Sequence, residues 1–122
     1  MRRILILPVL ALVLAASAVA AASAAPSPTS VVKLSVGNGS LHYDTKSLTA
    51  KAGLVRIDFT NNSTVAHNVS LEHGGEFEYG ASLTIKKGIA TTFLTLAKGT
   101  YHVYSSVGTD EDKGMSATLT VS

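Results

Sequence analysis

The side chains of this chain that could take part in chemistry are imidazoles, carboxylates and a thioether, but no thiol. The sequence of 122 residues contains four histidines, eight Asp and Glu residues and no cysteine. Imidazole, carboxylate and thioether groups are ligands for divalent transition metals, most favourably copper. A metal site with nitrogen and oxygen ligands is therefore one chemistry to consider, and thiolate chemistry is excluded.

The other groups with metal-binding potential have simpler explanations. His102 lies between two residues expected to face the core, so its own side chain is expected to point away from it. His42 and His73 lie near turns, where histidines are usually surface residues, although any of the three could assist a metal site. The acidic run 110–112 has carboxylates that suit Ca²⁺, but it lacks the glycine and spacing of a calcium loop. A solvated loop is expected there.

Strands must position these groups, because the chain is rich in Thr and Val, punctuated by Gly, and shows no 3.6-residue periodicity. Residues 54–60 alternate cleanly between apolar and polar side chains, which predicts a half-buried strand. About seven short strands separated by turn signals are typical of a two-sheet sandwich. The expected extended segments are 31–36, 41–43, 54–60, 67–71, 83–85, 91–96, 100–105 and 116–121, with a loop over 74–80.

The first 24 residues are predicted to be a cleaved signal peptide. Arg2 and Arg3 form a short basic start, and residues 4–22 are apolar and rich in Ala and Leu. Residues 22–24 read Ala-Ser-Ala, a small-x-small cleavage signal. Secretion by the general route, with cleavage after residue 24, is therefore expected.

The folded domain is expected over residues 31–122, after a short linker over 25–30. The alternative is that the leader stays as a membrane anchor. Pro8 and the weakly apolar alanines argue against a stable span, and no cluster of charges follows as a stop-transfer signal. The protein is thus expected outside the cytoplasm, as a periplasmic, cell-surface or secreted protein without a membrane span.

The charge balance of the domain is neutral once the leader is removed. The sequence has ten Lys and Arg against eight Asp and Glu, and two of the ten are Arg2 and Arg3. A neutral domain without a basic stripe argues against nucleic acid or an anionic membrane as a partner. The 98 residues after position 24 suffice for one domain with a modest core. Since no disulfide can form, packing and hydrogen bonds must stabilise it.

Five segments, in order, resemble the cupredoxins, the family of plastocyanin and azurin. In that family the last part of the chain reads G-x-Y-x-x-Cys, then a loop with a His, then G-Met and a final strand. Gly99, Tyr101, Gly114 and Met115 match this pattern, and the other similar segments are 41–53, 55–62, 64–69 and 99–104. The resemblance implies a cupredoxin-like Greek-key β-sandwich of about seven strands.

The resemblance also implies where a copper site would lie and how it has changed. The family's ligand positions correspond to His67, Ser105, Asp110 and Met115, with Ser105 in place of the cysteine and Asp110 in place of the second histidine. Asn68 matches the family residue that ties the two ligand loops together. A type 1 copper site needs two imidazoles and a thiolate in a trigonal plane, with a weak axial thioether. Blue-copper electron transfer is therefore not expected, and serine is expected to fill the cysteine's place and hydrogen-bond to His67.

Three functions stay open for such a domain. The leading hypothesis is a non-enzymatic binding module for an unknown protein or small molecule, with no catalytic residue and no required cofactor. The second is a copper-handling protein with a non-blue site built on His67, Asp110 and Met115. The third is a hydrolase using Ser105, His67 and Asp110, which are the residue types of a catalytic triad. No oxyanion hole or substrate pocket is marked in the sequence, which disfavours the hydrolase.

Overall fold

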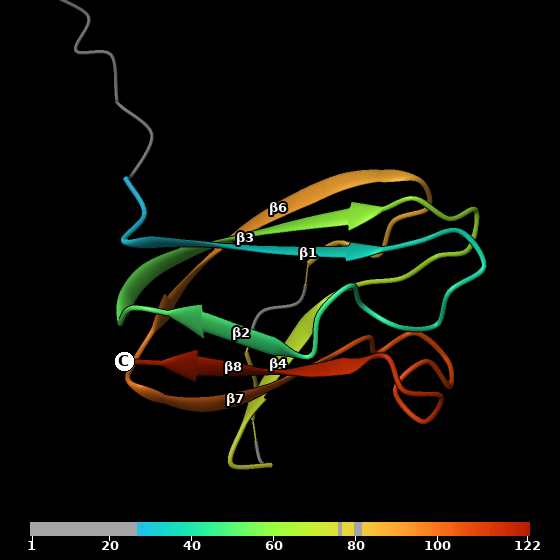
Figure 1. Cartoon of the computed structure of the whole chain (residues 1–122). Coiled ribbons are helices and arrows are strands. Elements are labelled where there is room, and N and C mark those ends of the chain that lie inside the picture. The colour runs from blue at the N-terminus through green and yellow to red at the C-terminus, as the bar shows by residue number, and fades with distance from the viewer. Residues whose placement is uncertain (1–26, 76, 80–81) are drawn as a thin grey trace, which may run out of the picture.

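The computed structural model describes residues 27–75, 77–79 and 82–122. Two β-sheets lie face to face (Figure 1), which confirms the predicted all-β cupredoxin-like sandwich. The predicted leader and the start of the linker fall on residues 1–26, outside the described part. The described strands are β1 (Ser30–Val36), β2 (Ser47–Ala50), β3 (Gly53–Asn61), β4 (Ser70–His73), β5 (Phe77–Tyr79), β6 (Gly88–Leu96), β7 (Gly99–Tyr104) and β8 (Ser116–Val121).

The smaller sheet, sheet A, has the strand order β1-β3-β6, and the larger, sheet B, has the order β2-β8-β7-β4-β5. β1 pairs with β3 in parallel, and β2 pairs with β8 in parallel, while the other neighbours are antiparallel. The chain therefore crosses between the two sheets several times before it closes on β8. Within the described ranges, no helix is long and apolar enough to cross a membrane.

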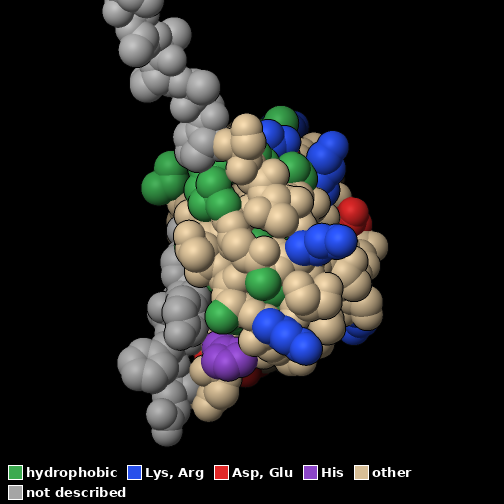
Figure 2. All heavy atoms as spheres, turned by 90° about the vertical axis from the view of Figure 1, so that its left-hand side faces the viewer, with side chains coloured by type: hydrophobic (Ala, Val, Ile, Leu, Met, Phe, Trp, Pro, Cys, Tyr) green, Lys and Arg blue, Asp and Glu red, His purple; other side chains and the backbone are tan. Residues whose placement is uncertain are grey.

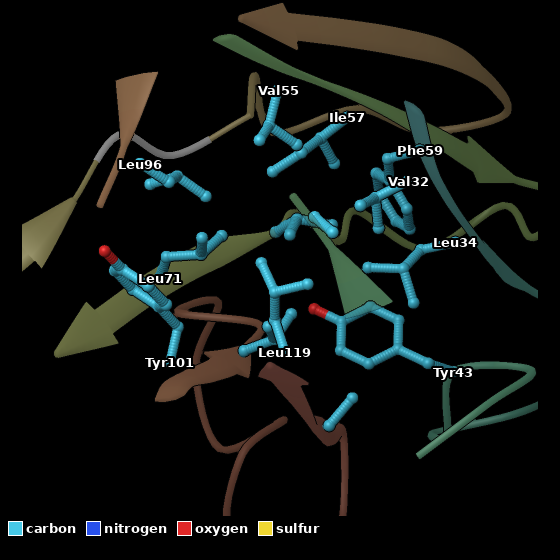
Figure 3. Close-up of a cluster of buried hydrophobic side chains, with 14 of the residues drawn as sticks. Val32, Leu34, Tyr43, Val55, Ile57, Phe59, Leu71, Leu96, Tyr101 and Leu119 are labelled. Atoms are coloured by element: carbon cyan, nitrogen blue, oxygen red, sulfur yellow. The ribbon is translucent and has the colours of Figure 1, made fainter. Parts of the chain in front are cut away.

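The core lies between the sheets and is built from alternate residues of their strands (Figure 3). On β3, Val55, Ile57 and Phe59 are all buried, as their alternation predicts. Ala117, Leu119 and Val121 of β8 are buried from the opposite sheet, which was also predicted. Burial of apolar surface at about 25 cal/mol per Å² is the main stabilising term in a domain without disulfides.

Two strand predictions in the first half of the chain differ from the structure. The segment 41–43 is not a strand, and Tyr43 makes only an isolated bridge with Val36. The strand comes later, as β2, which the sequence did not predict. β2 is four residues long and is held by parallel pairing with β8, far away in sequence. So short a strand depends on its distant partner rather than on local preference.

The second half differs at two further places. His67 to Val69 precede β4, which begins at Ser70, because their backbone bonds go to residues 82–85 rather than to a neighbouring strand. Residues 83–85 contain only a bridge from Ile85 to His67. The predicted loop over 74–80 contains strand β5, which pairs with β4; residues 76 and 80 lie outside the described part.

Charged residues are distributed unevenly between the two sheets. Around sheet A the charges are mostly basic, with Asp58 as the acidic residue on its strands. Acidic residues lie on β4, on β5 and in the β7–β8 loop. At the end of the sandwich that carries the carboxyl terminus, basic side chains outnumber acidic ones (Figure 2). A domain with no net charge can therefore still present faces of opposite sign.

Candidate functional site

Two connections at one end of the sandwich hold the residues at the predicted ligand positions. His67 lies on the β3–β4 connection, and Ser105, Asp110 and Met115 lie on the β7–β8 loop. This end is on the right of Figure 1, opposite the carboxyl terminus. His67 and Met115 are almost completely buried, and Asp110 is 8% exposed. The structure therefore brings residues from distant parts of the sequence into one buried polar cluster.

Asp110 is the centre of this cluster. His67 Nδ1 donates to Asp110 Oδ2 at 2.7 Å, and Ser105 Oγ donates to the same oxygen at 2.8 Å. The expected bond from Ser105 to His67 is therefore wrong, because the carboxylate stands between the two side chains and accepts from both. Bonds to a charged acceptor are stronger than neutral ones, and their worth increases in a buried setting.

The backbone of the β7–β8 loop fixes Asp110 in this position. Met115 N donates to Asp110 O at 3.0 Å, and Ser105 N donates to Met115 O at 3.2 Å. Gly114 has φ +104°, and a Cβ at this position would lie 2.8 Å from the ring of His42. This positive φ favours glycine, since other residues are strained in this backbone conformation. The Gly-Met pair of the sequence motif thus closes the loop behind the carboxylate.

Asn68 joins the two connections, as the family resemblance predicted. Its Oδ1 accepts from the backbone N of Ser106 at 2.8 Å, and its Nδ2 donates to Ser106 Oγ at 2.8 Å. Nδ2 also reaches Thr84 Oγ1 at 3.1 Å. The prediction that Asn68 ties the loops together is confirmed. These bonds hold the preceding residue, His67, beside the loop that carries Ser105.

Asn61 positions His67 from the other side, and the sequence did not reveal this role. Its Nδ2 donates to the carbonyls of Val65 and Ile85, both at 2.8 Å, and its Oδ1 accepts from Ser63. Ile85 in turn exchanges two backbone bonds with His67. The signal for this role was the Asn that ends the apolar alternation of β3. An Asn at the end of a strand does not by itself indicate a side-chain role of this kind.

Tyr43 supports the cluster from within the core. Its Oη donates to the carbonyl of Asn68 at 2.7 Å, and its ring packs edge-on against Phe59 (Figure 3). Burial, and secondly the negative charge of Asp110, raise the pKa of Tyr43 far above the ordinary tyrosine value of 10.0. The phenol therefore stays neutral in the folded protein at pH values where an unfolded tyrosine ionises.

This pKa shift predicts a loss of stability in alkali. A pKa that is higher in the folded state than in the unfolded state favours folding below pH 10, and this contribution decreases as the pH rises above 10. We expect the free energy of unfolding to fall more steeply above pH 10 in the unmodified protein than in Tyr43→Phe. Near pH 7 the variant should be less stable by about 1 kcal/mol, for the lost hydrogen bond. Urea denaturation at pH 7 to 11 measures both effects, and parallel pH profiles for the two proteins would contradict the assignment.

The other histidines stand apart from this cluster. His42 and His73 are exposed, as predicted, and their Nδ1 atoms lie 3.2 Å from Gly114 O and 3.1 Å from Thr100 O. His102 lies on the outer face of β7, stacks on Tyr104 and contacts Glu111 at 2.8 Å. Within the described part of the chain, no three His, Asp or Glu side chains are grouped closely enough to hold a metal ion.

The geometry has clear chemical consequences for copper and for hydrolysis. His67 Nδ1 faces the cluster and donates its hydrogen bond to Asp110, so this nitrogen has no free lone pair for an ion. The donor set therefore does not fit a type 1 copper ion. Ser105 Oγ is bonded to a carboxylate rather than to an imidazole and is buried, so neither the base contact nor the substrate access of a triad is present.

Comparison with known proteins agrees with this architecture. The family described as copper binding proteins, plastocyanin/azurin family, matches residues 30–122. No curated protein matches the sequence.

Several solved structures are similar to this fold. Dithionite-reduced auracyanin from Roseiflexus castenholzii is 22% identical with a TM-score of 0.71, and the match covers 80% of this chain and 99% of the auracyanin chain. Auracyanin A from Chloroflexus aurantiacus, a "blue" copper protein, is 24% identical with a TM-score of 0.68, covering 75% and 98%. An azurin from Methylomonas sp. strain J is 14% identical with a TM-score of 0.65, covering 77% and 98%.

Proposed function

Because this chain belongs to the plastocyanin/azurin family of copper-binding proteins but satisfies its site with its own side chains, we propose that it is a redox-inactive member of that family. The observation that carries this proposal is the position of Asp110 Oδ2, within 2.8 Å of both His67 Nδ1 and Ser105 Oγ. Polar groups that satisfy one another form a structural cluster and need no ion. The sandwich would then serve as a non-enzymatic binding module.

The proposed setting is outside the cytoplasm. The basic start, the apolar run and the small-x-small sequence of residues 1–24 support export with removal of the leader, so that the domain begins near residue 31. An exported domain usually relies on disulfides when its core is small. The hydrogen-bonded cluster offers this cysteine-free chain another means of joining two loops.

Copper titration tests the proposal. With Cu²⁺ added in small excess to purified protein, we expect no intense band in the red part of the visible spectrum. We also expect no saturable heat of binding that depends on His67. Weak binding at the histidines outside the cluster should disappear in the triple variant His42→Ala/His73→Ala/His102→Ala and persist in His67→Ala.

One saturable copper ion that is lost in His67→Ala and kept in the triple variant would contradict the proposal. That result would favour the copper-handling alternative, with a non-blue site on His67, Asp110 and Met115. It would require the bond between His67 and Asp110 to open, since Nδ1 is engaged in it. The titration therefore distinguishes the two functions, because His67 is buried in the cluster and the other three histidines lie outside it.

A further inference from the structure

Among the described residues, strand β6 forms an edge of sheet A, and no strand covers its second hydrogen-bonding side. It pairs with β3 along its full length, and none of the other strands that the structure describes pairs with it. Its nine residues, GIATTFLTL, include no charge and are rich in β-branched and aromatic side chains. A long, uncharged edge strand is a template for an added strand unless the protein protects it.

The outer face of sheet A carries exposed apolar side chains on both of its edge strands, β6 and β1. Ile89 and Phe93 of β6 are 70% and 43% exposed, and Val31 of β1 is 42% exposed. The strand register places Val31, Arg56 and Phe93 in one row across the three strands. Three of the five exposed large hydrophobic side chains in the described residues thus lie on one sheet face. Two of them, Ile89 and Phe93, lie on β6 itself, where they could contact a strand added at this edge.

Basic residues stand at both ends of β6. Lys86 and Lys87 come directly before the strand, and Lys98 follows it by two residues. In the middle of the face, Arg56 donates to Asp58 at 3.1 Å, while its Nε is buried without a partner among the described residues. This guanidinium is thus paired within the face, and its Nε is buried and not open to a partner. The lysines at the two ends of β6 favour a negatively charged partner.

A second copy of the chain does not suit this edge. Antiparallel pairing of two β6 strands over all nine residues is centred on Thr92. This register sets Lys86 of one copy opposite Lys98 of the other, at both ends of the pair. Like charges directly opposite each other destabilise strand pairing. The lysines therefore act against self-association and leave the edge open to a strand of opposite charge.

We propose that β6 docks an extended peptide segment of a partner protein, flanked by acidic residues, as an added strand of sheet A. Backbone hydrogen bonds would hold the peptide along the edge, as in other cases of strand addition. Ile89 and Phe93 would contact its alternate apolar side chains, and the lysines its acidic ends. This inference rests on the proposed role as a binding module and names the surface and the partner class for it.

Fluorescence anisotropy with labelled synthetic peptides tests the inference on the intact protein. The probe is Glu-Glu-Val-Thr-Val-Thr-Val-Glu-Glu, in about 0.1 M salt so that charges beyond about 10 Å are screened. We expect saturable binding that weakens at least about tenfold in Lys86→Glu/Lys98→Glu, because two attractive charges become repulsive. The matched control Lys46→Glu/Lys113→Glu changes net charge equally, away from β6, and should alter affinity less than about twofold.

Two further peptides and one further variant complete the test. The same peptide with alternate backbone nitrogens methylated, and a version with lysines at its ends, should both fail to bind. Phe93→Thr keeps a strand-forming residue and should weaken binding at least about threefold, by loss of apolar contact. Equal binding of acidic and lysine-flanked peptides, or of the methylated peptide, would overturn the inference. So would absence of binding at millimolar peptide, or a dimer of the free protein that Phe93→Lys dissociates. None of these results affects the copper titration, which tests the redox-inactive site separately.

Discussion

Replacing Asp110 with alanine is expected to lower the free energy of unfolding by about 2–6 kcal/mol, from about 1–3 kcal/mol for each of two buried donors left without an acceptor. Asp110 accepts from both His67 and Ser105, and both donors are buried. The substitution leaves both without an acceptor in a place that water does not reach. Urea denaturation at pH 7, with the midpoint and the slope both fitted, measures the loss.

Asp112→Ala is the matched control for this prediction. Asp112 lies in the same loop, two residues away, but it is exposed. Its removal should change stability by less than about 0.5 kcal/mol. If Asp110→Ala were as mild as Asp112→Ala, the cluster would not contribute to folding, and the central role given to this carboxylate would be wrong.

Restoring the two lost ligand types should give the protein a blue copper site. In the double substitution Ser105→Cys/Asp110→His, a thiolate and a second imidazole join His67 and Met115 at the family's ligand positions. Two imidazoles, a thiolate and an axial thioether are the donor set of type 1 copper. We expect the double variant to bind Cu²⁺ with an intense absorption band in the red part of the visible spectrum, and the unmodified protein to show none.

The single substitutions are the controls for this gain of function. Ser105→Cys keeps Asp110 bonded to His67, so the imidazole stays engaged and no intense band is expected. Asp110→His supplies two imidazoles without a thiolate, which gives at most a pale site. If the double variant bound copper without colour, the loops would not hold the ligands as the family resemblance implies.

The parts of the fold that the sequence predicted are those in which local pattern and distant packing agree. β3 and β8 alternate apolar and polar residues along their length, so each core side chain could be assigned from sequence. β2 and β5 are only four and three residues long and depend on pairing with β8 and β4. A strand that its partner stabilises carries little signal of its own.

The candidate site shows the same division. The family resemblance predicts that His67, Ser105 and Asp110 lie close together in the fold. It also predicts that Asn68 links the two loops. Which side chain bonds to which could not be predicted, because it depends on side-chain reach within the folded loops. The carboxylate lies between serine and imidazole, and this order decides against both a catalytic triad and an open metal site.

At the ligand positions that the family resemblance implies, hydrogen bonds within the site compensate for the missing cysteine. A serine alone in the cysteine's place would leave a buried imidazole and a hydroxyl that need partners. The aspartate in the second histidine's place gives both of them an acceptor at 2.7 and 2.8 Å. Ser105 and Asp110 therefore depend on each other, because Asp110 supplies the acceptor that the buried hydroxyl of Ser105 and the ring of His67 need.

The ring nitrogens of His67 provide the most direct test of this account. In a long-range ¹H–¹⁵N spectrum of the labelled protein near pH 7, we predict a proton on Nδ1, held by Asp110. We also predict no change in these signals when one equivalent of Cu²⁺ is added. An unprotonated Nδ1 whose signals vanish on addition of the paramagnetic ion would show an available ligand at this position, and would contradict the claim that the protein's own side chains have closed the metal site.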